Sequence, residues 1–304
     1  MNTAEKEQAL IDFFENQKVL IAFSGGVDST LLAAAAAAAA ASSNSNAKVF
    51  AVTIKTELVS DREVESAKKT AKELGINHLV IEKSVLNVPE IESNAHNRCF
   101  VCKREILTTL LDYAQKNGYE TVVEGTNYSD KLLSDQNKVP RPGLDFILKQ
   151  KEIQNQKNLN GSNNSDSKKE PKLETPLLML EMTKEEIREI AKKRNLDVAN
   201  KPPMSCLATR FSYNTKLNSN LLKTIEAAEI MTEEIGAKQI RIRVHTDSAG
   251  RNIARIEVEK SEMRIFFEEK NQAAVSDMIT FLKQNGFSYV TVDLEGFRSG
   301  SMDI

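Results

Sequence analysis

The sequence has few cysteines, no excess charge of either sign and no long apolar run. Three cysteines among 304 residues are too few for the disulfide framework of a small secreted protein. A formal net charge of −2 gives no overall attraction to nucleic acid or to an anionic membrane. No apolar stretch is long enough to cross a bilayer, and the acidic amphipathic N-terminus lacks a secretion signal. We therefore expect a cytoplasmic protein with no membrane partner, and a nucleic-acid partner is not expected.

Strands and helices alternate through the first half of the chain. The uninterrupted alanine run at residues 33–41 predicts a helix with a small-residue packing face. Ser60 with Glu63, and later Thr183 with Glu186, form capping boxes that predict further helix starts. Apolar runs predict strands at residues 18–23, 48–54, 77–82 and 120–124, with another helix at 103–117. This alternation predicts an α/β fold built on a doubly wound parallel sheet.

The second half predicts a smaller domain after a polar interruption. Residues 150–172 are rich in Asn, Ser and Lys without apolar periodicity, which is typical of a flexible surface insertion. After Pro202 and Pro203, the patterns predict helices at 217–235 and 272–285, and strands at 238–246, 252–259 and 288–294. We therefore expect two domains, residues 1–205 with the parallel sheet and residues 206–304 as a smaller α+β unit.

The string FSGGVDST at residues 23–30 lies between a predicted strand and a predicted helix. Its glycines allow the backbone N–H groups and the helix N-terminus to approach an anion. The string differs from the Walker loop, which needs a lysine, and an ordinary strand–turn–helix junction is the bland alternative. The candidate phosphate-binding residues are Ser24, Gly25, Gly26, Ser29 and Thr30, with Asp28 placed to hold Mg²⁺.

The three cysteines occur as a C-x-x-C pair, Cys99 and Cys102, and a distant Cys206. The pair precedes a predicted helix and is flanked by Arg98 and by a lysine, which favours thiolates. If all three thiols converge, they supply three ligands to one metal centre. Three interpretations remain open: an incidental pair, a zinc site with His96 as the fourth ligand, and a three-cysteine [4Fe–4S] cluster, which we favour.

Residues 239–245 alternate strictly between apolar and cationic side chains. Arg241, Arg243 and His245 share one strand face, and the isoleucines and valine share the other. A row of guanidinium groups suits a phosphate or a carboxylate. The bland alternative is a solvated sheet face. Arg255 and Glu257 also share a face, and they could simply pair with each other.

SGGVDST resembles the PP-loop of the ATP-pyrophosphatase superfamily, whose members release pyrophosphate and pass AMP to a substrate oxygen. A wider set of strings resembles the LarE family of sulfur transferases: NRCFVCK, EGTNYSD, RPGL, TPLLMLEMTKEEIR, KPPMSCLATRFSY, QIRIRVH, ARIEV and GFRSGSMD. Members adenylate a carboxylate of a pyridinium dicarboxylate mononucleotide, replace it with a thiocarboxylate, and so supply the cofactor of a nickel pincer enzyme.

The resemblance implies ATP and Mg²⁺ as cofactors and a small-molecule mononucleotide as the substrate. It places Gly125 and Thr126 with the phosphate loop, and it gives catalytic roles to Asp28, Cys206 and Arg210. Having all three cysteines is similar to the cluster-dependent members, which need a sulfide source; in others the cysteine matching Cys206 yields its own sulfur and becomes dehydroalanine. A homo-oligomer is expected. The residues that match acceptor-binding positions are Glu229, Arg241, Arg243, Glu257 and Arg298.

The sequence departs from the family pattern in residues 128–140, in the polar tract at 150–172 and in the long turn at 245–253. These departures concern loops more than motifs. The rival interpretations are a tRNA thiolase, an amide-forming synthetase and an ATP-binding sensor. A tRNA thiolase would use the same loop and cysteines, but neither the net charge nor an aromatic–basic stripe provides an RNA platform.

Overall fold

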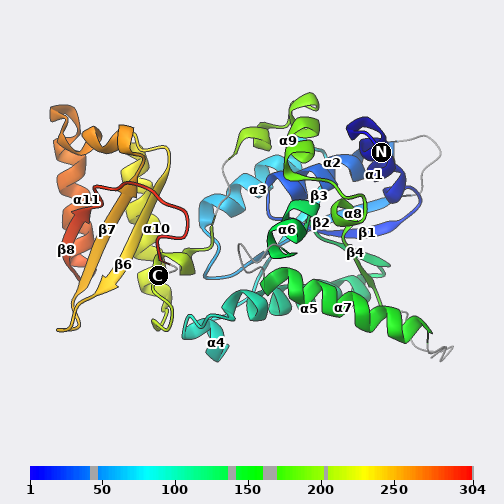
Figure 1. Cartoon of the computed structure of the whole chain (residues 1–304), viewed down its shortest axis with the longest axis horizontal. Coiled ribbons are helices and arrows are strands. Elements are labelled where there is room, and N and C mark those ends of the chain that lie inside the picture. Colours follow the sequence, from blue (N-terminus) through cyan, green and yellow to red (C-terminus); the bar gives the residue numbers. More distant parts are fainter. Residues whose placement is uncertain (42–46, 136–141, 160–169, 202–204, 303–304) are drawn as a thin grey trace. The chain divides into compact units, whose positions relative to one another are not determined.

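The computed structural model describes residues 1–41, 47–135, 142–159, 170–201 and 205–302. The chain divides into two compact units, each described by itself (Figure 1). Pro202 and Pro203, where the sequence changes character, lie outside the described residues. Unit 1 comprises Met1–Thr56, Asp61–Lys83 and Cys99–Met204, and unit 2 comprises Glu57–Ser60, Ser84–Arg98 and Ser205–Ile304.

Unit 1 contains a five-stranded sheet in the order β3-β2-β1-β4-β5. All its pairings are parallel, as the alternation of strands and helices predicted. The strands are β1 (Lys18–Ala22), β2 (Lys48–Lys55), β3 (Asn77–Glu82), β4 (Thr121–Val123) and β5 (Lys172–Glu174). The predicted doubly wound α/β fold is therefore confirmed.

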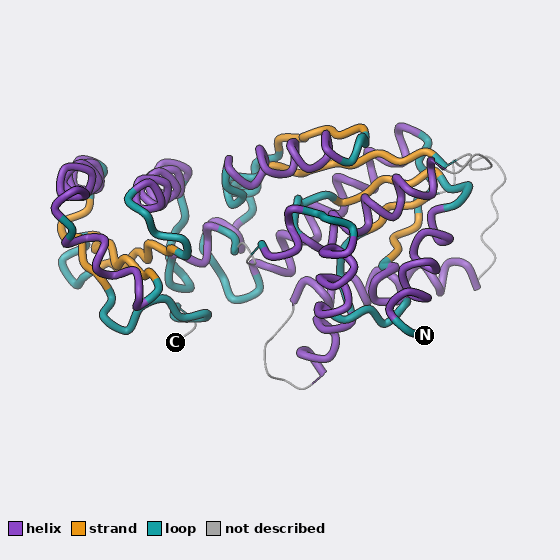
Figure 2. The backbone as a smooth tube through the Cα atoms, turned by 90° about the horizontal axis from the view of Figure 1, so that it is seen from above, coloured by secondary structure: helices purple, strands orange, loops and turns teal. Residues whose placement is uncertain are grey.

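Helices cover both faces of this sheet (Figures 1 and 2). Successive residues of β1 point to opposite faces, so Val19 and Ile21 belong to one apolar core and Leu20 to the other. The first core includes residues of α1, α2, α3 and α9, and the second includes residues of α5 and α7. The helices of unit 1 are α1 (Thr3–Phe14), α2 (Val27–Ala41), α3 (Asp61–Glu73), α5 (Arg98–Asn117), α6 (Tyr128–Asp135), α7 (Pro142–Leu159), α8 (Pro176–Met179), α9 (Lys184–Lys193) and the 3₁₀ helix η1 (Asp197–Asn200).

The alanine run forms the buried helix α2, as predicted. Ala33, Ala35 and Ala36 expose 1% of their surface or less. Small side chains bring the helix axis close to its neighbours, and α2 contacts α1, α9 and the sheet strands β1 and β2. The predicted capping box at Thr183 is also present, because Thr183 and Glu186 bond each other's backbone N–H groups.

Two local expectations were wrong. The C-x-x-C pair was expected just before a helix starting at residue 103, whereas α5 begins at Arg98 and contains both thiols within its first two turns. The tract at 150–172 was expected as a flexible insertion, whereas α7 extends to Leu159 and β5 begins at Lys172. Residues 160–169 of that tract lie outside the described residues. Tertiary packing accounts for the second case, since Phe146 and Ile147 of α7 join the second core.

Unit 2 contains a three-stranded mixed sheet in the order β6-β7-β8. β6 and β7 form an antiparallel pair, and β7 pairs with β8 in parallel. Its elements are α4 (Pro89–Glu92), η2 (Leu207–Arg210), α10 (Ser219–Glu234), β6 (Ile240–Thr246), β7 (Asn252–Val258), η3 (Lys260–Phe267), η4 (Glu269–Asn271), α11 (Gln272–Gln284) and β8 (Phe287–Val292). The predicted smaller domain with both helices and strands is confirmed.

Hydrogen bonds join the early segments of unit 2, residues 57–60 and 84–98, to the rest of that unit. The Asn94 amide nitrogen donates to the carbonyls of Phe211 and Ser212, at 3.2 and 2.9 Å. Leu207 N–H donates to the carbonyl of Leu58 at 3.0 Å. Residues 57–60 and 84–98 therefore complete unit 2, although nothing in their local sequence signals it. Across the described parts of both units, we find no helix whose length and hydropathy would let it span a membrane.

Candidate functional site

The phosphate loop lies at the carboxyl end of β1, at the point where the strand order reverses. The chain leaves β1 for β2 and β3 on one side and later returns to β4 on the other. In open α/β sheets this switch point forms the ligand-binding crevice. Phe23 N–H bonds the carbonyl of Val52 at 2.9 Å, which fixes where the loop leaves the sheet.

Hydroxyl groups brace the loop from within. The Ser29 hydroxyl accepts from Ser24 N–H at 3.2 Å and donates to the Gly26 carbonyl at 3.1 Å. Ser29 and Thr30 expose 4% and 0% of their surface, whereas Ser24 is exposed. Of these three hydroxyl residues, Ser24 is the one presented to solvent, and Ser29 holds the loop's shape.

Gly25 is required by both its backbone and its surroundings. Its φ is +68°, a conformation that costs an L-residue about 1–2 kcal/mol. A Cβ at this position would lie 2.9 Å from the Cα of Ala67 in α3. The loop and α3 therefore pack at a distance that only glycine allows.

The segment after β4 packs against the start of α2, and the cofactor-binding role of Gly125 and Thr126 stays a prediction. A Cβ on Gly125 would lie 3.1 Å from the Cβ of Asp28. The buried carboxylate of Glu124 accepts from Thr126 N–H at 3.0 Å and from the Lys103 ammonium at 2.7 Å. Lys103 directly follows Cys102, so this ion pair ties the helix that carries the thiols to the edge of the nucleotide crevice.

Asp28 is held by two partners that sequence reasoning missed. Its carboxylate accepts from the Lys184 ammonium and, at 3.4 Å, from the Asn127 amide. Burial raises the pKa of Asp28, and the Lys184 charge opposes this shift. Lys184 follows the capping residue of α9 and gave no local signal, since only the fold brings α9 to the loop. Carboxylate oxygens are ligands that Mg²⁺ prefers, so Asp28 is a candidate ligand for this ion.

The arginines of β6 are buried, which excludes the alternative of a solvated sheet face. Arg241 exposes 8% of its surface and Arg243 exposes 4%. The strand register places Glu257 opposite Arg241 and Arg255 opposite Arg243. Arg243 Nε donates to the Glu257 carboxylate at 3.0 Å. Burial lowers the pKa of Arg243, and the Glu257 charge opposes this shift.

Arg210 donates hydrogen bonds to the backbone carbonyls before and at Cys206. Its Nε and Nη2 form a bidentate pair with the Glu229 carboxylate, both at 2.9 Å. Its Nη1 donates to the carbonyls of Ser205 and Cys206, at 2.7 and 3.2 Å. All three guanidinium nitrogens thus have internal acceptors. These contacts hold the backbone around Cys206, and the catalytic role of Arg210 stays a prediction.

Two serines and an acidic residue complete the network, and the sequence gave no sign of them. The Ser205 hydroxyl accepts from Arg241 Nε at 3.1 Å, and the Ser301 hydroxyl donates to Glu257 at 2.6 Å. Asp293 pairs with Arg255 and, at 3.5 Å, with Arg298. Arg298 is exposed, so it lies at the rim of the buried group.

All three cysteines are thiols, and Cys99 and Cys206 are exposed. Cys99 and Cys102 lie three positions apart in α5, so they share one helix face. Cys206 is the N-cap of η2 in unit 2, and its convergence with the pair stays a prediction. His96, the alternative zinc ligand, stacks on Tyr213 with 4.0 Å between ring centroids. Within the described ranges, no group of three His, Cys, Asp or Glu side chains could hold a metal ion.

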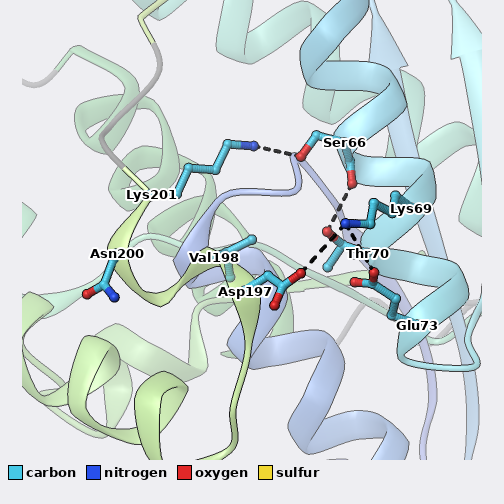
Figure 3. A pocket seen from close by; sticks show the side chains of 8 residues that line it. All are labelled: Ser66, Lys69, Thr70, Glu73, Asp197, Val198, Asn200 and Lys201. Atoms are coloured by element: carbon cyan, nitrogen blue, oxygen red, sulfur yellow. Dashed lines mark hydrogen bonds and ion pairs between the residues drawn. The ribbon is translucent and has the colours of Figure 1, made fainter. Parts of the chain in front are cut away.

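A cavity of about 430 Å³ lies between α3 and η1 in unit 1 (Figure 3). Its charged groups pair with each other, since Lys69 contacts Glu73 and Asp197. Burial lowers the pKa of Lys201, whose ammonium donates to the Ser66 hydroxyl at 2.8 Å. None of its lining residues belongs to the predicted site.

Comparison with known proteins agrees with the geometry of the loop. Over 98% of its length, the chain is 31% identical to an uncharacterised protein from Synechocystis, with 97% of that protein covered. It is 29% identical to a pyridinium-3,5-bisthiocarboxylic acid mononucleotide synthase from Lactiplantibacillus plantarum, over 99% of this chain and 94% of the relative. This similarity confirms the resemblance to the LarE family. A family model described as the PP-loop domain matches residues 1–204, which implies the use of ATP and Mg²⁺. The chain therefore belongs to the PP-loop domain family.

Proposed function

We propose that this protein is an ATP-dependent sulfur transferase that converts a substrate carboxylate into a thiocarboxylate. The proposal rests on Cys206, whose thiol is exposed. Its backbone carbonyl accepts a hydrogen bond from Arg210, which is buried and paired with Glu229. The proposed substrate is pyridinium-3,5-dicarboxylate mononucleotide, on the way to a nickel-pincer cofactor. The full-length similarity to a bisthiocarboxylic acid mononucleotide synthase supports that substrate.

In the first step, the phosphate loop holds the triphosphate of ATP while Asp28 holds Mg²⁺ against it. A carboxylate oxygen of the substrate attacks the α-phosphorus, and pyrophosphate leaves. The product is an acyl adenylate. The loop contributes by positioning and by charge neutralisation, because its backbone N–H groups are fixed before the reaction begins. On the substrate side, Arg241, Arg243 and Glu229, with Glu257 and Arg298, form the proposed acceptor-binding group.

In the second step, a sulfur nucleophile attacks the carbonyl carbon of the adenylate, and AMP departs with the former carboxylate oxygen. Under one scheme inorganic sulfide is the nucleophile and Cys206 holds its carrier. Under the other scheme Cys206 attacks as a thiolate and forms a thioester. Loss of the Cα proton and cleavage of the Cβ–S bond then release the thiocarboxylate and leave dehydroalanine. Arg210 positions Cys206 under both schemes.

We propose that Cys99, Cys102 and Cys206 would together hold a [4Fe–4S] cluster once the three thiols converge. The first two lie three positions apart on one face of α5, and the third is an exposed thiol. When bound, such a cluster supplies an iron without a protein ligand, where sulfide is carried. Anaerobic purification followed by iron and acid-labile sulfide analysis tests this assignment, with roughly four of each expected per chain.

The activity is tested with MgATP and the pyridinium dicarboxylate mononucleotide, with pyrophosphate and thiocarboxylate measured together. Acceptor-dependent release of pyrophosphate, followed by a thiocarboxylate product, supports the proposal. Pyrophosphate release without any acceptor dependence would instead fit an ATP-binding sensor. Retention of tRNA in a band shift, with thiolation of the RNA, would replace the small-molecule acceptor.

The variant Cys99→Ala separates the two sulfur schemes. It should abolish repeated turnover with added sulfide if the three cysteines act together. It should leave a single turnover intact if Cys206 gives up its own sulfur, and the mass of the chain would then fall as dehydroalanine forms. The matched control is Ser93→Ala, an exposed position outside both the cysteine pair and the arginine network.

A further inference from the structure

Arg98 differs from two other buried arginines of unit 2, Arg210 and Arg243, in having no anionic partner among the described residues. It exposes 6% of its surface, and its Nε and Nη1 are buried without a hydrogen-bond partner. Its one side-chain contact of note is with Tyr213, whose ring centroid lies 4.4 Å from the guanidinium carbon. No ion pair of Arg98 occurs among the described residues.

The contrast with Arg210 and Arg243 makes this absence informative. Those two side chains are buried to a similar degree, and each is paired with a glutamate at 2.9 or 3.0 Å. Burying a guanidinium costs free energy unless its donors are satisfied. The face of Tyr213 attracts the charge of Arg98 but provides no acceptor for N–H groups in the guanidinium plane.

The surroundings of Arg98 favour an anion. Arg98 is the first residue of the 20-residue helix α5, where the helix dipole is positive. Asn94, four residues earlier, holds the segment after Cys206 through its amide nitrogen, at 2.9 Å from the Ser212 carbonyl. Cys99 follows Arg98 directly, so an anion held here would lie next to a proposed sulfur-handling residue.

We propose that Arg98 anchors an oxyanion-binding site in unit 2, which takes a phosphate or carboxylate group of a ligand. The ligand's oxygens accept from the guanidinium Nε and Nη1, which have no hydrogen-bond partner among the described residues. The half-buried Tyr213 ring holds the guanidinium plane in place from one side. The arginines of β6, by contrast, already have acceptors among Ser205, Glu257 and backbone carbonyls. This inference rests on the surroundings of Arg98 and does not depend on sulfur transfer.

The test measures binding of inorganic phosphate to the full chain by calorimetry, with chloride balancing the ionic strength. The nucleotide crevice is first filled with a non-hydrolysable ATP analogue, so that the phosphate loop does not contribute. A parallel titration with acetate distinguishes a carboxylate site from a phosphate site. The variants are Arg98→Met, which removes the charge, and Arg98→Lys, which keeps it; Arg104→Met, an exposed arginine of the same helix, is the control.

We expect Arg98→Met to weaken binding of the preferred anion at least about tenfold, as loss of a charge-assisted hydrogen bond does. Arg98→Lys should retain part of the binding, and Arg104→Met should bind like the unmodified chain. Without ligand, Arg98→Met should unfold at an equal or higher urea concentration, because it removes an unpaired buried charge. If phosphate and acetate bind no more weakly to Arg98→Met, the proposal is wrong. Should that variant not fold, unchanged affinity in Arg98→Lys overturns it equally.

Discussion

The phosphate loop of unit 1 and the arginine network of unit 2 are both suited to anions, but different chemical groups form them. The loop uses backbone N–H groups shaped by Gly25 and braced by the Ser29 hydroxyl. The network uses long cationic side chains, most of which are already matched by buried carboxylates. The first is ready to accept a charge, whereas the second has to exchange internal partners to do so.

The difference determines which substitutions each site is most sensitive to. A backbone site depends on chain conformation, so its sensitive positions are those where a side chain cannot fit. A site made of ion pairs depends on its partners, so its sensitive positions are those that leave a buried charge alone. Changes in the two regions should therefore differ in kind and in size.

The largest effect on folding should come from Glu229→Gln in the network. The substitution leaves Arg210 buried without its bidentate partner, and breaking a buried pair costs about 3–5 kcal/mol of the free energy of unfolding. Urea unfolding followed by circular dichroism measures the loss. Lys68→Ala, in a pair whose members are 50% and 70% exposed, is the control and should cost less than about 1 kcal/mol. Equal losses of unfolding free energy in both variants would show that the buried Arg210–Glu229 pair contributes no more than an exposed ion pair.

A smaller effect should come from Gly25→Ala in the loop. Its Cβ would be forced toward Ala67, and overpacking costs about 1–3 kcal/mol beyond the strain of the backbone angle. Gly118→Ala is the matched control, because its φ is +72° and no atom lies within 4 Å of the added Cβ. Only the first variant should also lose acceptor-dependent pyrophosphate release. If both variants behave alike, the close approach of α3 does not constrain the loop.

The smallest effect should be the pH dependence that one histidine in each unit contributes. Burial and the nearby Lys68 lower the pKa of His78 below 6.5, and burial and Arg255 lower the pKa of His245. The unfolded chain therefore binds more protons than the folded chain in this window. The free energy of unfolding that depends on the neutral histidines is therefore fully present above pH 6.5. It is lost as the pH falls from 6.5 through the lowered pKa of each histidine in the folded chain. His78→Gln and His245→Gln should each flatten the dependence of the urea midpoint on pH; an unchanged slope in both would contradict the assignment.

Local patterns predicted the features that depend on nearby residues. The loop string, the alanine helix and the alternation of β6 can each be recognised from a few consecutive residues. The structure also places Gly125 beside Asp28. Amphipathic periodicity failed at residues 150–159, where a polar sequence is helical because Phe146 and Ile147 anchor the same helix in the core.

The partners that neutralise buried charges could not be predicted. Lys184 reaches Asp28 across 156 positions, and Ser301 reaches Glu257 across 44. Neither residue has a local signal, because a single serine or lysine has the same sequence context whether it is solvated or buried. Arg98 was noted only as a neighbour of the thiols. Within the described part of the chain, its unsatisfied donors stand out only beside Arg210 and Arg243, which are buried to a similar degree and paired with glutamates.

The most direct test of sulfur transfer by an adenylating enzyme is a comparison of the unmodified chain with Cys206→Ser. Pyrophosphate release and thiocarboxylate formation are measured in the same reaction, with MgATP, sulfide and the dicarboxylate mononucleotide. We predict that the variant still releases pyrophosphate in an acceptor-dependent manner while thiocarboxylate falls to background. Thiocarboxylate formation at an undiminished rate in Cys206→Ser would contradict the account.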